Sequence, residues 1–311
     1  MLIGGKIRSG RAKKPVLAGI LAVCAVFVLS GARAPSGTPA VRTADRIISV
    51  SPNITEMIIG LGLGSRIIAA DEYSLELLPP GLPKIDYFYP DQEFILSLEP
   101  DLIISTEHNV YGAADDPYKL LEGMGIRRFY LPTSRSIDEI KRDIKALAAE
   151  LEVADRGEAL VSVMEREIQS VADIGRRLTA DPAFHKKTVY LEISPFPDPV
   201  TMGRETFLDE MIGIIGARNV FSDRTGWIAP GAEAILERNP EVILTNVNFI
   251  DNPVGEIKTR QGFASITAVQ EGQVYQIDAN SSSRPSQHIT LALRQMALAI
   301  YPGEYASLGG E

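Results

Sequence analysis

The amino-acid sequence predicts an α/β protein with two similar lobes, each a mostly parallel sheet flanked by helices, joined by one long rigid helix. Short β-branched runs alternate with helical patterns in both halves of the chain. A segment of the first half recurs in the second half, and a long amphipathic stretch without proline lies between them. With 311 residues, 45% of them hydrophobic, the chain can bury a core in each lobe.

The first 44 residues carry seven basic side chains and no acidic one. An apolar run of 14 residues, 16–29, follows five of the basic residues and is shorter than the roughly 20 residues that a membrane-spanning helix needs. This pattern is typical of a secretory signal. We predict a signal peptide or N-terminal anchor over residues 1–32, cleaved near Ala32, and a flexible linker over residues 33–44. Two alternatives stay open: lipidation of Cys24, which ends a loose lipobox, and an uncleaved anchor helix.

The N-terminal lobe is predicted over residues 45–153 and begins with a strand, a helix and a second strand. A β-branched run at residues 46–50 is followed by Ser51 and Pro52, which suit the start of a helix. Several glycines end that helix, and another apolar run begins at Ile67. This spacing predicts parallel strands with helices on the faces of the sheet.

Residues 90–104 and 230–244 are related by an internal repeat. Each copy contains a short helical pattern, a proline and a buried-strand pattern. The identical pairs are Pro90/Pro230, Glu93/Glu233, Ile95/Ile235, Leu96/Leu236, Pro100/Pro240 and Ile103/Ile243. The period is far too long for a solenoid, so we expect two similar lobes, the second over residues 186–306.

Residues 137–178 contain no proline and place apolar side chains at spacings of three and four, which predicts amphipathic helix. Gly157 lies near an expected break between two helices. We predict that the second helix, over residues 154–180, connects the lobes. Because one helix is stiffer than a hinge of paired strands, we expect little lobe motion when a ligand binds.

Composition and motifs argue against several functions. Acidic residues outnumber basic ones, 40 against 31, which disfavours nucleic acid as a partner. His108, His185 and His288 show no metal-ligand spacing, and no catalytic motif is present. We therefore expect neither an enzyme nor a resident metal or cofactor. Without its leader, the protein is expected to be soluble and monomeric.

Six segments resemble the solute-binding proteins of ABC importers that carry cobalamin, haem and iron–siderophore complexes. They read RIISVSPNITE at 46–56, EPDLII at 99–104, TMGRETFLDE at 201–210, GARNV at 216–220, AVQEGQVY at 268–275 and SRP at 283–285. They occur in the family's order, and the resemblance covers about residues 46–305. It implies two lobes joined by one rigid helix and a ligand site in the cleft between them.

The resemblance also implies a docking surface. In this family one glutamate on each lobe docks into arginine pockets of the permease, and the matching positions are Glu93 and Glu233. They are the only identical charged pair in the internal repeat. The alternative is that each carboxylate stabilises the first turn of a helix through the helix dipole, by about 0.3–1 kcal/mol.

Aromatic and cationic side chains are the cleft residues that the resemblance implies. The ligand-binding candidates are Tyr73, Tyr87, Tyr89, Phe196, Arg204, Trp227 and Arg284. Core packing is the alternative role of the aromatic rings, and an ion pair with a nearby acid is the alternative role of the arginines. His108 and Tyr111 are candidates for reaching a metal centre of the ligand, with an ordinary surface loop as the alternative.

The function that these features predict is capture of a corrinoid (cobalamin) or an iron complex, outside the cytoplasmic membrane, for delivery to an ABC permease and its ATPase. Few cleft cations disfavour an anionic catecholate siderophore, whereas several aromatic rings favour a flat macrocycle, cobalamin before haem. A haem- or ferric-siderophore-binding protein of the same family is one alternative. An exported sensor or interaction protein with this fold is another. Contact with a membrane is expected only through the leader or the permease.

Overall fold

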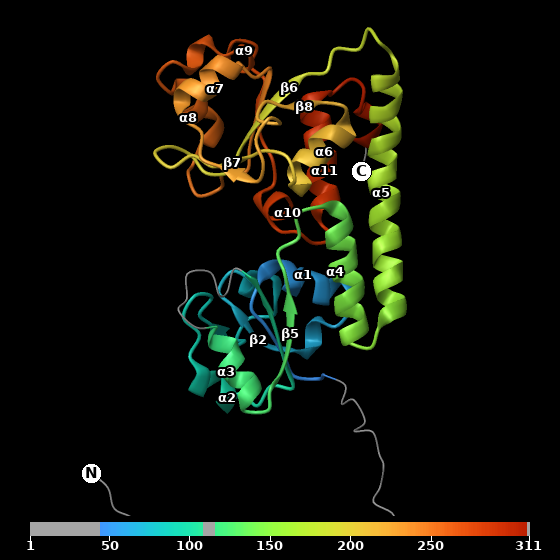
Figure 1. Ribbon diagram of the computed structural model, residues 1–311, viewed down its shortest axis with the longest axis vertical. Coiled ribbons are helices and arrows are strands. Elements are labelled where there is room, and N and C mark those ends of the chain that lie inside the picture. The colour runs from blue at the N-terminus through green and yellow to red at the C-terminus, as the bar shows by residue number, and fades with distance from the viewer. Residues whose placement is uncertain (1–43, 108–115, 310–311) are drawn as a thin grey trace, which may run out of the picture. The chain divides into compact units, whose positions relative to one another are not determined.

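The computed structural model describes residues 44–107 and 116–309, which build two α/β lobes (Figure 1). Helices α4 and α5 lie along one side of the view, and α5 runs alongside both lobes. In this part of the chain, every helix is too short or too polar to span a bilayer.

Both lobes belong to one compact unit of the chain. The predicted leader over residues 1–32 and the linker over residues 33–44, apart from Ala44, lie outside the described residues. Cleavage and lipidation of this segment therefore stay predictions.

The N-terminal lobe contains a five-stranded parallel sheet with the strand order β3-β2-β1-β4-β5. Its strands are β1 (Ile47–Ser49), β2 (Ile67–Asp71), β3 (Lys84–Ile85), β4 (Leu102–Thr106) and β5 (Arg127–Leu131). Its helices are α1 (Pro52–Gly60), α2 (Gln92–Ser97), α3 (Pro117–Gly123) and α4 (Ile137–Glu150), with 3₁₀ turns at Gly64–Arg66 and Leu75–Leu77. β1 and β4 are buried throughout, as expected of central strands in a sheet covered on both faces.

The C-terminal lobe contains a four-stranded parallel sheet with the order β11-β10-β6-β8 and a small antiparallel pair, β7 and β9. Its strands are β6 (Thr188–Glu192), β7 (Thr201–Met202), β8 (Arg218–Asn219), β9 (Trp227–Ile228), β10 (Val242–Thr245) and β11 (Val274–Gln276). Its helices are α6 (Phe207–Ile215), α7 (Ala232–Arg238), α8 (Pro253–Thr259), α9 (Thr267–Gln270), α10 (Ala279–Ser283) and α11 (Ile289–Ile300), with 3₁₀ turns at Phe263–Ser265 and Ala306–Leu308. The predicted fold class is confirmed.

Both copies of the internal repeat fold into a short helix and a buried strand, α2 with β4 and α7 with β10. Ile95 and Ile235 occupy matching positions and are completely buried. The residues before the two prolines, Glu99 and Asn239, both have positive φ angles, 48° and 41°. Each repeat therefore ends its helix with the same left-handed turn before the chain enters the sheet.

The connecting helix is α5 (Ala154–Ala180), whose 27 residues span about 40 Å. It packs against α4 of the first lobe and against α6 and α11 of the second. The expected break falls just before α5, near Glu152, which has a φ of 59°, and Gly157 lies inside α5, as the predicted start of the second helix at residue 154 requires. A Cβ at Gly157 would collide with Ala148, and one at Gly175 with the backbone of Ile214.

The apolar core is continuous through the two lobes. One cluster of buried side chains includes Ile47 of β1, Ile144 of α4, Met164 of α5 and Met211 of α6. Smaller clusters cover the other faces of the two sheets. Because α4, α5 and α6 share one core, the lobes are held by packing as well as by chain connectivity.

Candidate ligand-binding site between the lobes

Two adjacent cavities of about 360 and 260 Å³ lie between the lobes. Thr133, Ser134, Phe207 and Trp227 line both of them. The first lobe contributes residues that end or follow its strands, because the carboxyl ends of parallel strands meet at one edge of a sheet. The second lobe contributes the start of α6, the β9 strand and the loop after α10.

The walls are mainly hydroxyl-bearing and aromatic. The remaining lining residues are Ser51, Pro52, Asn53, Tyr87, Thr106, Glu107, Arg135, Glu205, Thr206, Thr225, Gly226, Ser283, Arg284 and Pro285. Such walls offer hydrogen bonds to amides and hydroxyls and flat surfaces to rings. A larger groove of about 810 Å³ between α4, α5 and α6 is lined by charged, uncharged polar and aliphatic side chains without an aromatic ring, so it is a weaker candidate.

Tyr87 and Trp227 are the predicted aromatic residues that reach the cavities. Both line the smaller one, and Trp227 is 54% exposed. Tyr73 packs edge-on against Tyr87 with the ring centroids 5.6 Å apart, and Phe88 does so from 4.9 Å. Tyr89 is 85% exposed and does not line either cavity. The first lobe thus presents a group of aromatic rings next to the cavity.

Tyr87 is fixed by its backbone and by burial. Its N–H donates to the Glu72 carboxylate at 3.0 Å. Burial raises the pKa of the Tyr87 hydroxyl to about 12. The phenol is therefore neutral at physiological pH and can both donate and accept a hydrogen bond in the cleft.

A buried hydrogen-bond chain at the carboxyl end of β2 holds the turn that carries Tyr73. Ser49 Oγ and Thr55 Oγ1 lie 2.7 Å apart, Thr55 donates to Ser74 Oγ at 3.0 Å, and Ser74 donates to Asp71. Asp71 Oδ1 also accepts the N–H groups of Tyr73 and Ser74 at 2.9 and 3.1 Å. Burial raises the pKa of Asp71 to about 6, against the opposing effect of the Ser74 and Tyr73 hydrogen bonds.

Phe196 and Arg204 do not line the cavities. Phe196 packs on Phe263 with the centroids 6.3 Å apart and lies 5.1 Å from the Arg260 guanidinium, which is itself paired with buried Glu192. Arg204 is exposed and forms a backbone bridge with Thr225. The core alternative therefore accounts for the position of Phe196, and we leave both residues out of the proposed site.

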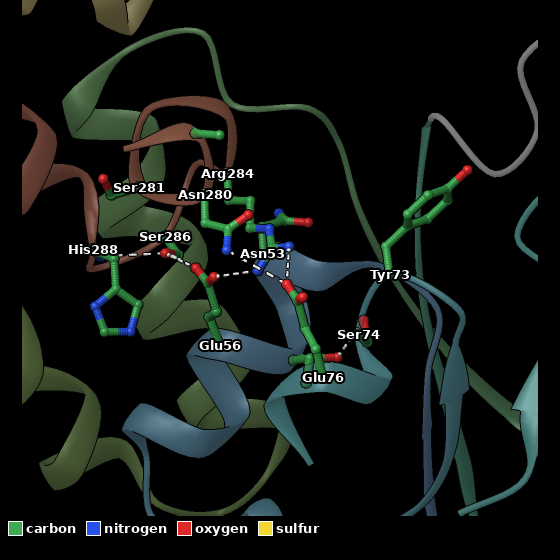
Figure 2. Close-up of polar contacts among 12 residues, drawn as sticks. Asn53, Glu56, Tyr73, Ser74, Glu76, Asn280, Ser281, Arg284, Ser286 and His288 are labelled. Atoms are coloured by element: carbon green, nitrogen blue, oxygen red, sulfur yellow. Dashed lines mark hydrogen bonds and ion pairs between the residues drawn. The ribbon is translucent and has the colours of Figure 1, made fainter. Parts of the chain in front are cut away.

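Arg284 lines the smaller cavity but is held by two carboxylates of the first lobe (Figure 2). Its Nη1 donates to Glu56 at 3.0 Å and its Nη2 to Glu76 at 2.8 Å. Burial lowers the pKa of Arg284, but the hydrogen bonds with Glu76 and Glu56 outweigh it and the net shift is upward. The guanidinium is thus charged. Its contacts are ion pairs with nearby acids, the alternative role considered for the arginines.

Several cavity residues were missed from the sequence, chiefly Phe207, Arg135 and the serines and threonines of the walls. Phe207 stands inside one of the segments that carry the resemblance and begins α6 after the capping residue Thr206. That position, a ring at a helix start, was a usable signal. The hydroxyl residues gave none, because serine and threonine are common in any loop.

Glu93 and Glu233 occupy the first turns of α2 and α7, and both are exposed. Figure 1 shows both helices on the side of the view away from α5, one on each lobe. His108 and Tyr111 lie outside the described residues. Within the described residues, no group of three or more potential metal ligands occurs.

This geometry defines a solute-binding protein: two α/β lobes, a connecting helix and a cavity between the lobes. A family model described as "Periplasmic binding protein" matches residues 47–281, so the chain belongs to the periplasmic binding protein family. Members of this family are binding proteins and not enzymes, which confirms the expectation that the protein is not an enzyme. The family and the lipoprotein relative are consistent with an extracytoplasmic location.

Three similar proteins show the range of the family. An uncharacterised ABC transporter substrate-binding lipoprotein of Bacillus subtilis is 28% identical over 84% of this chain and 81% of its own length. The vitamin B12-binding protein of Vibrio cholerae is 27% identical over 81% of this chain and 88% of its own. The crystal structure of a possible iron-binding periplasmic protein of Staphylococcus epidermidis has a TM-score of 0.71 and 28% identity, covering 84% of this chain and all of that one.

Proposed function

We propose that this substrate-binding protein of an ABC transporter captures a corrinoid in the cleft and delivers it to the permease and its ATPase. The observation that carries the proposal is the cavity to which Tyr87 and Trp227 contribute from different lobes, among uncharged hydroxyl side chains. A ring system fits between aromatic side chains, and peripheral amides find hydrogen-bond partners in the walls. The vitamin B12-binding relative supports this ligand class.

The cavities are small for a whole corrinoid, so the ligand extends beyond them. Tyr73 and Phe88 adjoin Tyr87 and are about half exposed, at 51% and 53%. We place one edge of the macrocycle in the cavities and part of its face on these rings. An iron complex with a neutral, apolar periphery is the runner-up ligand, supported by the possible iron-binding neighbour.

A matched pair of variants tests the site. Tyr87→Leu removes a ring from the cavity, whereas Phe196→Leu removes one from the second-lobe core outside it. By calorimetric titration with cyanocobalamin, Tyr87→Leu is expected to weaken binding about 3- to 10-fold, because an aromatic contact contributes about 0.5–1.5 kcal/mol. Phe196→Leu is expected to bind like the wild type. Equal losses in both variants, or no binding by the wild type, would contradict the proposal.

We further propose that Glu93 and Glu233 dock on basic pockets of the permease. Exposed carboxylates steer and align a positive partner but add little at a distant cleft. Reversing both to lysine is expected to abolish uptake of labelled cobalamin while ligand affinity stays unchanged, and a single reversal is expected to do less. Glu237→Lys, on the same helix as Glu233, is the control. Normal uptake by the double variant, or a loss of ligand affinity in it, would overturn the docking role.

The proposed function also requires export, which we assign to the leader over residues 1–32. We propose cleavage near Ala32, which would leave a mature chain without its only cysteine. The name of the Bacillus subtilis relative includes "lipoprotein", which supports the Cys24 alternative. The intact mass of the exported protein distinguishes a chain that begins after Ala32 from one that begins with an acylated Cys24, and the second result would replace our proposal.

A further inference from the structure

Arg284, Glu56 and Glu76 form one cluster at the wall of the smaller cavity (Figure 2). The arginine comes from the second lobe, and the glutamates come from α1 and the 3₁₀ turn Leu75–Leu77 of the first. Glu56 also accepts a hydrogen bond from Ser286 Oγ at 2.5 Å, and its backbone carbonyl accepts one from Gln287 at 2.9 Å. The cluster is therefore part of the contact between the lobes.

The burial of the three side chains differs. Arg284 and Glu56 expose 12% and 5% of their side chains, whereas Glu76 exposes 59%. The inner pair is shielded from water, and the outer carboxylate stands at the solvent side. Because both terminal nitrogens of Arg284 already have carboxylate partners, its positive charge is more than balanced where it faces the cavity.

The other charged residues on the cavity walls do not restore a positive balance. Arg135 and the two glutamates Glu107 and Glu205 line the larger cavity. Across the described residues, the walls and the Arg284 cluster thus combine two arginines with four glutamates. A carboxylate of a ligand would have to compete with Glu56 for Arg284 and would leave a buried glutamate without its cation, which is unfavourable.

We propose that Glu56 and Glu76 set the charge selectivity of the cleft, by neutralising Arg284 so that ligands without net negative charge are admitted and anionic ligands are disfavoured. The inference rests on the proposed function, because it assumes that this cleft holds the ligand. Glu56 positions the guanidinium at the wall, and Glu76 adds the charge that makes the cluster negative. Removing the Glu76 carboxylate is expected to make the cleft more attractive to anions. Arg284 is expected to stay in place, because its ion pair with Glu56 remains.

Quenching of Trp227 fluorescence tests the charge of the cleft without any ligand. Trp227 is the only tryptophan in the chain and lines the same cavity as Arg284. Iodide, an anion, and acrylamide, which is neutral, are titrated against the wild type, Glu76→Gln and Glu158→Gln at low ionic strength. Glu158 lies on the connecting helix α5, pairs with Lys145 of α4 and serves as the control for net charge.

The expected result is a higher ratio of iodide to acrylamide quenching in Glu76→Gln, by up to about twofold, because a unit charge within about 10 Å changes the local concentration of an anion by this much. Acrylamide quenching and the Glu158→Gln control are expected to stay at wild-type values. A change in acrylamide quenching alone would mean that the cleft opened, and an unchanged ratio would mean that Glu76 does not set its potential. Either result would overturn the inference.

Glu56→Gln is the second variant, since it removes the inner carboxylate while keeping its shape. It is expected to raise the iodide ratio as well. Titrations with haem, which carries two propionates, and with cyanocobalamin, which has no net charge, then compare ligands. Glu76→Gln is expected to shift relative affinity toward haem. If the wild type binds neither ligand, the proposed function fails. The ratio of iodide to acrylamide quenching still tests whether Glu56 and Glu76 set the charge of the cleft.

Discussion

Asp71 is the buried acid on which the aromatic side of the cleft depends. It accepts two backbone N–H groups and the Ser74 hydroxyl, and it is completely buried at the end of β2. Its pKa of about 6 lies above the ordinary value of 3.8 because burial disfavours the charged form. The folded protein therefore holds a proton that the unfolded chain has lost between about pH 4 and 6.

We predict that Asp71→Asn flattens the pH dependence of stability in this range. In the wild type the free energy of unfolding is expected to fall as the pH rises from 4 to 6, because the folded state binds more protons there than the unfolded state. The contribution of Asp71 is present below pH 4 and is lost as the pH rises through its folded pKa. It is on the order of 3 kcal/mol, because the folded pKa lies about two units above the ordinary value and each unit corresponds to about 1.4 kcal/mol.

Urea unfolding of both proteins at several pH values measures this difference. The stability of the variant relative to the wild type should increase from pH 4 to pH 7. Parallel curves for the two proteins would show that Asp71 titrates normally.

The sequence could indicate which residue types face the cleft but not which individual side chains do so. Tyr87 and Trp227 line the cavities, whereas Phe196, also in a loop after a strand, is held against Phe263 by core packing. Arg284 is bound by Glu56, 228 residues away in the chain. A partner at that distance depends on how the lobes meet, which no local pattern encodes. The ligand roles of these residues stay proposals.

The connecting helix α5 is fitted to each lobe by one glycine. Gly157 lets α4 approach in the first lobe, and Gly175 lets the backbone of α6 approach in the second. Glycine is unfavourable in a helix interior by up to about 1 kcal/mol relative to alanine. Close packing against a neighbouring helix explains its presence at these two positions, because a Cβ would collide there. The two contacts make the helix a fixed spacer between the lobes.

We predict that Gly175→Ala destabilises the protein by about 1–3 kcal/mol, because its Cβ would overlap the Ile214 carbonyl and force α5 and α6 apart. Gly213→Ala is the matched control: Gly213 is exposed in α6, and a Cβ there would meet no neighbour. That substitution should stabilise the protein slightly through helix propensity. Urea midpoints of the two variants check the prediction. Equal effects would show that Gly175 has no packing role.

Helices and strands were predictable where periodicity and proline act together. The repeated pattern of helix, proline and strand holds in both lobes, and even the left-handed residue before each proline is repeated. Gly157 indicated the region of the break between α4 and α5, but its own position inside α5 reflects close packing, because glycine both ends helices and allows close contact within them. Only the neighbour, Ala148 on α4, distinguishes the two roles.

Among the described residues, three contacts join the two lobes besides the chain itself. They share an apolar core through α4, α5 and α6, and Glu210 of α6 accepts the N–H of Ile137 at the start of α4 at 2.8 Å. The Arg284 cluster is the third contact. Wide opening of the cleft would have to break these contacts together. Their loss would cost a large part of the free energy of unfolding, which is only about 5–15 kcal/mol for a whole protein.

We therefore predict that the lobes move little on ligand binding. The radius of gyration from X-ray scattering should change only slightly when cyanocobalamin is added at saturation, because rigid packing across the connecting helix resists hinge closure. Contraction by several per cent would show that the shared core yields and that the lobes close about a hinge.

The arrangement of the lobes was predictable from the repeat and the connecting helix. The charge of the cleft was not, since it arises from side chains that the fold brings together.

The central claim is that the cavity between the lobes holds one macrocyclic ligand, and Trp227 fluorescence tests it most directly. Trp227 lines both cavities and is the only tryptophan, so an absorbing ligand in the cleft must lie close to the sole emitter. Titration with cobalamin, haem and a ferric siderophore should give strong, saturable quenching by cobalamin at one ligand per protein and weaker responses to the anionic ligands. Absence of saturable quenching by all three would contradict the site and the function proposed for it.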